Sequence, residues 1–309
     1  MLPHTIDENR MLNTEMPSAA HTELDLYPTV ELISALVEDQ LGAVNALRGA
    51  AAALSAAVEA ALPRMLEGGR LIYVGAGTSG RLGVLDSVEL YPTFSWPRER
   101  AVALLAGGPG AMFVAVEGAE DDFSQGGIDV EAVHVGPADV VLLVAASGET
   151  PYVLGALAAA RAAGALTLGF ANNPHAPLTQ QAHVGIELDT GSEVISGSTR
   201  LKAGSAQKMA LNTFSSALMV RMNKVYGNLM VDLKATNAKL LRRAVALTQR
   251  ATGCDAAQAQ RTLHACGQQV KVAIVAIQRG IDVAAARACL DGVGGNLRRA
   301  LEPGAGDTE

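Results

Sequence analysis

The stretch GRLIYVGAGTSGRLGVLDSVEL, residues 69–90, predicts a strand, a tight turn and a helix in succession. Its apolar run Leu71–Val74 has no polar alternation, which is typical of a strand buried on both faces of a parallel sheet. Glycine, threonine and serine crowd residues 75–81, and an amphipathic stretch follows. Such a turn exposes free backbone N–H groups at the positive end of a helix dipole, so it favours the binding of a phosphate.

A second turn, AASGETP at residues 145–151, has the same chemistry, because it also follows an apolar strand and opens a helix. The first turn is not a Walker A loop, since Gly80 is followed by Arg81 where that loop needs lysine. It does match the dinucleotide fingerprint GxGxxG, but the next predicted strand has no acidic residue at its end. The alternative for each turn is that hydroxyls cap a helix and glycines permit a tight bend. Two such turns in one sheet favour a phosphate site.

Strands and helices alternate through the middle of the chain. Predicted strands cover residues 70–76, 100–108, 139–147, 166–173 and 184–190, and predicted helices cover residues 79–90, 111–121 and 150–164. This alternation predicts the α/β class, with a doubly wound three-layer sandwich around a mostly parallel sheet. One or two helices over residues 28–69, with Thr29 as N-cap, precede it.

Beyond residue 200 the pattern becomes helical. Helices are predicted over residues 202–227, 236–253, 255–268, 269–280 and 282–301. We therefore expect a mobile arm over 1–22, the α/β domain with its N-terminal helices over 23–250, a small helical unit over 251–302 and a disordered tail over 303–309.

Composition excludes several classes of function. The chain has 309 residues and a net charge of −7, which is unlike a nucleic-acid binder. Neither a membrane span nor a secretory signal is expected, because no apolar stretch is long enough and no basic region precedes one near the start. The three cysteines Cys254, Cys266 and Cys289 have no metal-ligand spacing. Reduced thiols, a cytoplasmic location and no metal are therefore expected.

Several long motifs resemble the N-acetylmuramic acid 6-phosphate etherases, a family of sugar isomerase (SIS) domain proteins. The motifs stand in the family's order over about residues 22–301: TELDLYPTVELISAL at 22–36, the opening stretch, AVEGAEDD at 115–122, SGETP at 147–151, GSEVISGSTRLKAGSAQK at 191–208 and KVYGNLMVDLKATNAKL at 224–240. The resemblance implies that residues 23–250 form a SIS phosphosugar domain and that 251–302 resemble a ubiquitin-associated bundle. It also implies a cytoplasmic homodimer that needs no cofactor or metal.

The resemblance implies a reaction as well: cleavage of the D-lactyl ether at C3 of N-acetylmuramic acid 6-phosphate. A base removes the C2 proton of the open-chain aldehyde, lactate leaves from C3 with help from an acid, and water adds back at C3. The two family carboxyls match Glu89 and Glu120. Glu89 is then the acid/base at the lactyl oxygen and Glu120 the group at C2, and either assignment can be reversed. Two carboxyls suffice if one is held protonated.

Substrate-binding residues follow from the two turns and from the motif at 191–208. They are Gly77, Thr78, Ser79, Ser147, Gly148, Thr150, Ser198 and Lys202, with Arg200 as a further cation. Solvent-facing roles for Arg200 and Lys202, and a structural role for Glu193, are the alternatives. The chain departs from the family at Leu90-Tyr91, where CP is common, and at Glu149, where a basic residue is common. A negative charge beside a phosphate is unfavourable unless the side chain points away.

Spacing raises a question about Glu89. It follows Ser79 by ten residues, on the order of 15 Å along a straight helix. Either the phosphate rests mainly on Ser147, Gly148 and Thr150, or Glu89 serves the site of a second subunit. Two other functions remain open: a non-catalytic sugar-phosphate sensor of the glucokinase-regulator type, which carries two SIS domains, and an aldose–ketose phosphosugar isomerase.

Overall fold

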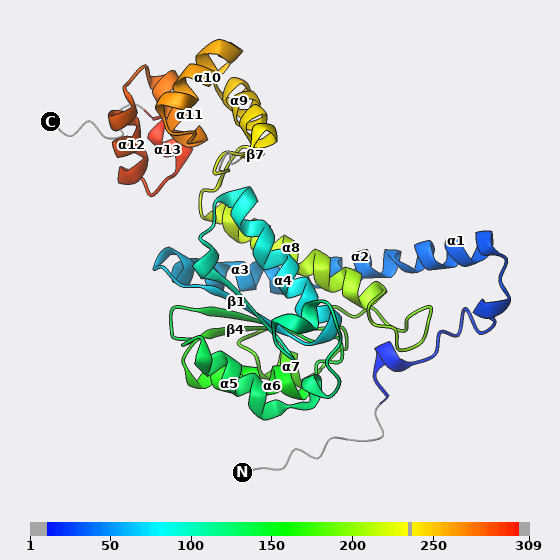
Figure 1. Ribbon diagram of the computed structural model, residues 1–309. Helices are drawn as coiled ribbons and strands as arrows, with labels where there is room; N and C mark the ends of the chain where they lie inside the picture. The colour runs from blue at the N-terminus through cyan, green and yellow to red at the C-terminus, as the bar shows by residue number, and fades with distance from the viewer. Residues whose placement is uncertain (1–10, 234–236, 303–309) are drawn as a thin grey trace. The chain divides into compact units, whose positions relative to one another are not determined.

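The computed structural model describes residues 11–233 and 237–302 and divides the chain into two compact units. The sheet unit comprises residues 1–87 and 99–214, and the helical unit comprises residues 88–98 and 215–309. Figure 1 shows the course of the chain. Each unit has its own hydrophobic core, so each is described by itself.

The sheet unit is built on a parallel sheet with the strand order β2-β1-β3-β4-β5. The strands are β1 (Leu71–Gly75), β2 (Ala101–Leu105), β3 (Val140–Val144), β4 (Leu166–Ala171) and β5 (Val184–Glu187). All four pairings are parallel, and β1, β3 and β4 are buried throughout. The predicted α/β class and parallel sheet are thereby confirmed. Burial on both faces explains why these strands lack polar alternation.

Helices cover both faces of the sheet (Figure 1). One face carries α5 (Phe123–Ala132), α6 (Pro151–Ala162) and α7 (Pro177–Gln181). The other face carries α3 (Ala51–Leu66) and the first parts of α4 (Gly77–Phe94) and α8 (Lys202–Arg221). On that face the Tyr73 hydroxyl of β1 donates to Asp86 of α4 at 2.8 Å, and Asn212 of α8 donates to the same carboxylate. This buried network ties two helices to β1.

The helices that precede the sheet differ in detail from the prediction. Instead of one or two helices, α1 (Thr29–Asp39), α2 (Leu41–Gly49) and α3 follow one another. Thr29 is the first residue of α1 rather than its cap, because Pro28 occupies the capping position without a side-chain hydrogen bond. Among the described residues no single helix is long and apolar enough to cross a membrane. The helical stretches 29–49 and 51–66 are long and apolar enough only when they are taken together, and they are bent where they meet.

Glycines made one helix hard to predict. α5 was not expected, since Gly126 and Gly127 weaken its helical pattern. In the structure α5 and α6 approach so closely that a Cβ on Gly126 would lie 1.9 Å from the Tyr152 carbonyl oxygen. A Cβ on Gly155 would lie 1.9 Å from the Phe123 carbonyl oxygen. The glycines are therefore a packing requirement of the helix pair.

Two other predictions are wrong in part. The helix expected over 111–121 is replaced by the short 3₁₀ turns η4 (Pro109–Met112) and η5 (Ala119–Asp121), with residues 113–118 exposed between them. The arm expected over 1–22 also contains a short regular element. Residues 1–10 lie outside the described residues, but Asn13–Glu15 form the 3₁₀ turn η1, in which Thr14 is fully buried.

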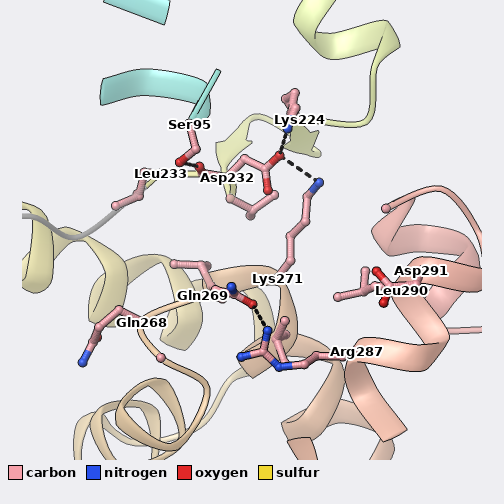
Figure 2. A pocket seen from close by; sticks show the side chains of 15 residues that line it. Ser95, Lys224, Asp232, Leu233, Gln268, Gln269, Lys271, Arg287, Leu290 and Asp291 are labelled. Atoms are coloured by element: carbon pink, nitrogen blue, oxygen red, sulfur yellow. Dashed lines mark hydrogen bonds and ion pairs between the residues drawn. The ribbon is translucent and has the colours of Figure 1, made fainter. Parts of the chain in front are cut away.

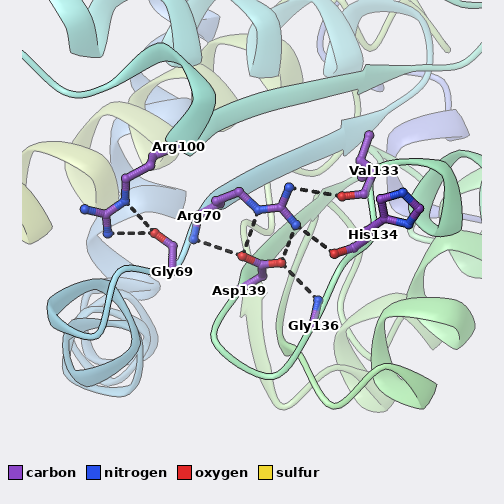
Figure 3. Close-up of polar contacts among 7 residues, drawn as sticks. All are labelled: Gly69, Arg70, Arg100, Val133, His134, Gly136 and Asp139. Carbon is purple, nitrogen blue, oxygen red and sulfur yellow. Dashed lines mark hydrogen bonds and ion pairs between the residues drawn. The ribbon is translucent and has the colours of Figure 1, made fainter.

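Polar contacts fix the amino ends of β1 and β3 (Figure 3). Asp139, which precedes β3, accepts hydrogen bonds from the backbone, Nε and Nη2 of Arg70 at 3.0, 3.1 and 2.7 Å, and from Gly136 N at 3.0 Å. Arg100, just before β2, donates to the Gly69 carbonyl oxygen at 2.7 Å. Burial raises the pKa of Asp139, but hydrogen bonds from Arg70 and Gly136 outweigh that effect and hold the pKa below its usual value.

Asp139→Asn is expected to destabilise the protein by about 1–3 kcal/mol at pH 7. The amide side chain of asparagine cannot accept all the hydrogen bonds that the carboxylate accepts from Arg70 and Gly136. A depressed folded-state pKa stabilises the fold above the unfolded-state pKa, and that stabilisation is lost as pH falls through the folded-state pKa. The difference in unfolding free energy from the wild type should therefore shrink below about pH 4. Denaturant unfolding at several pH values measures it. Asp255→Asn, which keeps a competent helix cap, is the control. A difference that is constant with pH would contradict this account.

The helical unit contains α9 (Ala238–Thr252), α10 (Ala256–Ala265), α11 (Val270–Arg279), α12 (Val283–Gly292) and α13 (Leu297–Ala300), preceded by a short hairpin of β6 (Val225–Tyr226) and β7 (Leu229–Met230). α9 packs against α10 and α11, and its Leu240 and Val245 join the core built on α11. The unit therefore starts before residue 251, where the sequence placed its boundary. It also takes in residues 88–98.

Candidate functional site

The strand order brings the two Ser/Gly loops together. Strands β1 and β3 are neighbours, and the chain leaves them in opposite directions, toward β2 and toward β4. Their last residues, Gly75 and Val144, are paired in the register. Loops 75–81 and 145–151 therefore emerge side by side at the carboxyl edge, at the switch point where open α/β sheets bind ligands. The sequence predicted both loops but could not place them next to each other.

The first loop presents backbone rather than hydroxyl groups. α4 starts at Gly77, so the N–H groups of Gly77, Thr78 and Ser79 have no acceptor within the helix. The Ser79 hydroxyl is buried and donates to Gln207 Oε1 at 2.9 Å. Gly80 is required here, because a Cβ on it would lie 2.5 Å from the Gly75 carbonyl oxygen. The loop can hold an anion through amides at the start of a helix.

The second loop presents hydroxyls as well. The Ser147 Oγ lies 3.4 Å from the Thr150 Oγ1 and accepts a hydrogen bond from Glu149 N at 3.1 Å. Gly148 has φ +71°, and a Cβ there would lie 2.4 Å from the Ala176 Cβ. α6 begins at Pro151, which has no N–H, and Val153 N donates to the Thr150 carbonyl oxygen at 3.0 Å, so Tyr152 N is the donor at the start of α6 without an acceptor in the helix. Glu149 lines a small cavity of about 30 Å³ with Asn173 and His175.

Buried amide side chains form hydrogen bonds with residues of both loops, and the sequence analysis did not single them out. Gln207 of α8 accepts from Ser79 and donates to the Asn172 Oδ1 at 2.8 Å. Asn172 in turn donates to the Ala203 carbonyl oxygen at 3.3 Å. Asn173 donates to the Ala146 carbonyl oxygen at 2.9 Å. The only available signal was the pair Asn172-Asn173 directly after an apolar strand, at the same sheet edge as the loops.

Lys202 does not have the free ammonium group that substrate binding needs. Its Nζ lies 2.6 Å from Asp39 Oδ1 and 2.7 Å from the Ser192 carbonyl oxygen, and the side chain is buried. The side chain thus ties the end of α1 to the start of α8. Ser198 is half-buried, and Arg200 is exposed in the preceding loop. Of the two predicted cations, Arg200 is the one in a position to meet a ligand.

Glu193 caps α8. Its carboxylate accepts hydrogen bonds from Lys202 N at 2.9 Å and Ala203 N at 2.8 Å, and the side chain is fully buried. Burial raises the pKa of Glu193, while these amides and the charge of Lys202 act in the opposite direction. Glu193 therefore has a structural role, which was the alternative to a role in substrate binding. It fixes where the loop 191–201 meets the sheet edge.

The two predicted catalytic carboxyls are both exposed. Glu120 lies in η5 of the sheet unit, after Gly118 in a left-handed conformation. Glu89 lies on α4 within the helical unit. Because α4 is continuous, Glu89 is about 15 Å from Ser79 along the helix axis.

The helical unit has a cavity of about 650 Å³ that contains none of the predicted site residues (Figure 2). Lys224 and Lys271 both contact Asp232 Oδ2, at 2.7 and 3.2 Å. Burial lowers the pKa of Lys271, although Asp232 opposes that effect. Arg287 lines the same cavity and donates to Gln269 Oε1 at 2.7 Å. Among the described residues no cluster of His, Cys, Asp and Glu suits a metal ion.

Ser147→Ala is expected to raise the KM for a phosphate-bearing substrate about tenfold or more, with kcat little changed. A hydrogen bond to a charged phosphate contributes about 1.5–3 kcal/mol, and it does so in the ground state and the transition state alike. Lys202→Met is expected to affect stability instead of substrate binding. It should leave KM near the wild-type value and lower the melting temperature, since Asp39 loses its partner. Steady-state kinetics and thermal unfolding of both variants separate the two roles. A raised KM with unchanged stability in Lys202→Met would restore this residue to the binding site.

Models of known protein families match three stretches of the chain. The model described as "Glucokinase regulatory protein N-terminal SIS domain" matches residues 53–161, the SIS domain model matches 122–217, and the model of the "C-terminal lid domain of glucokinase regulatory protein" matches 227–271. These models divide the chain much as its two units do.

Relatives match over nearly the whole chain. An N-acetylmuramic acid 6-phosphate etherase from Deinococcus radiodurans is 59% identical over 291 residues, which are 94% of this chain and 95% of that protein. Proteins of the same name from Rubrobacter xylanophilus and Cutibacterium acnes are 47% and 45% identical. These matches cover 95% and 94% of this chain, and 97% and 96% of the relatives.

Proposed function

The chain belongs to the N-acetylmuramic acid 6-phosphate etherases, and we propose that it cleaves the D-lactyl ether of N-acetylmuramic acid 6-phosphate. The products are N-acetylglucosamine 6-phosphate and D-lactate, so the protein is a carbon–oxygen lyase of amino-sugar catabolism and cell-wall recycling. The observation that carries the proposal is 59% identity over almost the full length of both chains. The two anion-binding loops at the sheet edge support a substrate that carries a phosphate.

The phosphate rests on the Ser147 loop in this proposal. Ser147, Gly148 and Thr150 offer hydroxyls and the start of α6, which together favour a doubly charged group. The amides of Gly77, Thr78 and Ser79 hold another polar part of the sugar. Ser198 and Arg200, in the loop before α8, are placed to bind the phosphate or the lactyl carboxylate. Lys202 supports this loop by donating a hydrogen bond to the Ser192 carbonyl oxygen.

The chemistry needs proton transfers at two neighbouring carbons. A carboxylate removes the C2 proton of the open-chain aldehyde, and a carboxylic acid protonates the C3 oxygen as lactate leaves. The unsaturated aldehyde then takes up water at C3, so the net change is hydrolysis of the ether. Glu120 is the proposed group at C2 and Glu89 the proposed group at the lactyl oxygen. Their exposure supports contact with a ligand.

Glu89→Gln and Glu120→Gln are each expected to lower kcat for D-lactate release by about 10²–10⁴-fold, the usual loss when a general acid or base is removed. Glu117→Gln is the matched control, since it removes an exposed carboxylate three residues before Glu120. Stopped assays of D-lactate with N-acetylmuramic acid 6-phosphate measure the rates. Full activity in either Glu89→Gln or Glu120→Gln would remove that residue from the mechanism.

A homodimer with shared sites is the second part of the proposal. Exposed apolar side chains follow one face of α1 and α2: Val30, Ile33, Val37, Leu41 and Val44, which are 72, 55, 64, 54 and 38% exposed. Their spacing of three and four residues makes one stripe, and a second copy of the chain is the occupant proposed for it. Asp39, at the end of α1, binds Lys202 beside the loop 191–201.

Mixing Glu89→Gln with Glu120→Gln subunits tests the shared site. If each site takes one carboxyl from each chain, an equimolar mixture recovers roughly a quarter of wild-type activity, because about half of the dimers are mixed and one of the two sites in each mixed dimer is intact. Ile33→Glu/Val37→Glu in the stripe should give monomers by light scattering and abolish this recovery. Ser34→Ala on the same helix is the control for dimer formation. Absence of recovery in mixtures that do form dimers would reject sharing.

The same substrate separates the other functions. A regulatory sensor would bind N-acetylmuramic acid 6-phosphate without turnover, and an aldose–ketose isomerase would release no D-lactate. Two of the matching family models carry the name of glucokinase regulatory protein, yet the relatives at 45–59% identity are named as etherases. The free thiols of Cys254, Cys266 and Cys289 support a cytoplasmic location.

A further inference from the structure

An N-terminal strap, residues 12–16, lies against the candidate site. Its centre is Thr14, which is fully buried. Thr14 N donates to the Asn173 Oδ1 at 3.2 Å, and the Asn173 Nδ2 donates back to the Thr14 Oγ1 at 3.0 Å. The same Nδ2 donates to the carbonyl oxygen of Ala146 at 2.9 Å. One amide side chain thus joins the strap to the residue before Ser147.

Neighbouring residues of the strap reach two further loops. Asn13 Nδ2 donates to Asp189 Oδ1 at 3.4 Å, just beyond β5. Glu15 lies against Gly197, because a Cβ built on that glycine would be 3.0 Å from the Glu15 carboxylate. The strap therefore contacts the ends of β4 and β5 and the loop that carries Ser198, and it reaches the end of β3 through Asn173.

We propose that the strap is a positioning element of the substrate site and that Thr14, acting through Asn173, holds the Ser147 loop in its binding conformation. The inference rests on the function proposed above, since it concerns the same site. Thr14 touches no substrate atom in this proposal. Its hydrogen bonds satisfy Asn173, whose amide would otherwise be free to turn away from the Ala146 carbonyl oxygen. The Ser147 loop binds the phosphate in the ground state and the transition state alike. Loss of its binding conformation therefore raises KM and leaves kcat unchanged.

Thr14→Val keeps the shape of the side chain and removes the Oγ1 acceptor. We expect a KM for N-acetylmuramic acid 6-phosphate about tenfold higher, as for the loss of one hydrogen bond of about 1.4 kcal/mol, with kcat within about a factor of two of wild type. Thr14→Ser restores the hydroxyl and should restore KM. Thr248→Val is the matched control, because Thr248 is equally buried, bonds only within α9 and belongs to the helical unit. It should leave KM unchanged.

Binding of N-acetylglucosamine 6-phosphate, measured by calorimetry, gives a second readout that needs no turnover. The strap proposal predicts about tenfold weaker binding in Thr14→Val and wild-type binding in Thr14→Ser. If the wild type binds this phosphosugar but releases no D-lactate, the etherase proposal fails while the strap is still tested by these affinities. A Thr14→Val variant with wild-type KM and affinity overturns the strap proposal. So does a loss of stability or kcat without any change in either constant.

Discussion

The parallel pairing of β1 with β3 is the constraint on which the candidate site depends. Both strands end in a loop of small and hydroxylated residues, and both loops open a helix. Pairing the strands places the starts of two helices and the hydroxyls of Ser147 and Thr150 at one sheet edge, which a single loop could not achieve. At the opposite ends of the same strands, Asp139 and Arg70 hold the register. A slip of one residue would invert the faces of the strand and break that contact.

The chemistry of the loops could be read from the sequence, whereas their support could not. Ser147, Gly148 and Thr150 stand in a short motif whose composition suits an anion, and their role as a phosphate site stays a prediction. Ser79 belongs to a similar motif, yet its hydroxyl turns inward to Gln207. Hydrogen-bond direction depends on residues distant in the chain, and no local pattern encodes it. Lys202 illustrates the same limit: its charge was evident, but its pairing with Asp39, 163 residues earlier, was not.

The fold was predictable where periodicity is strong and failed where packing overrides propensity. Fully buried strands such as Val140–Val144 have an unmistakable apolar run. The helix at Phe123–Ala132 was missed because its glycines serve a close helix contact. The burial of Thr14 has no local signal either, since the surrounding residues 11–18 mix polar and apolar side chains. Whether such a segment is ordered depends on its partners in the fold.

The reciprocal glycine contact between α5 and α6 also matters for ligand binding. Backbone touches backbone there, so the two helices have no flexible side chains to absorb a displacement. The start of α6 faces the proposed phosphate, and the chain enters α5 directly after the turn that carries Glu120. Any methyl group added at this seam would drive the helices apart and carry an anion-binding end and an acid-bearing turn away from each other. Evolution of new substrate preferences in this scaffold is thus more open at the loops than along that seam.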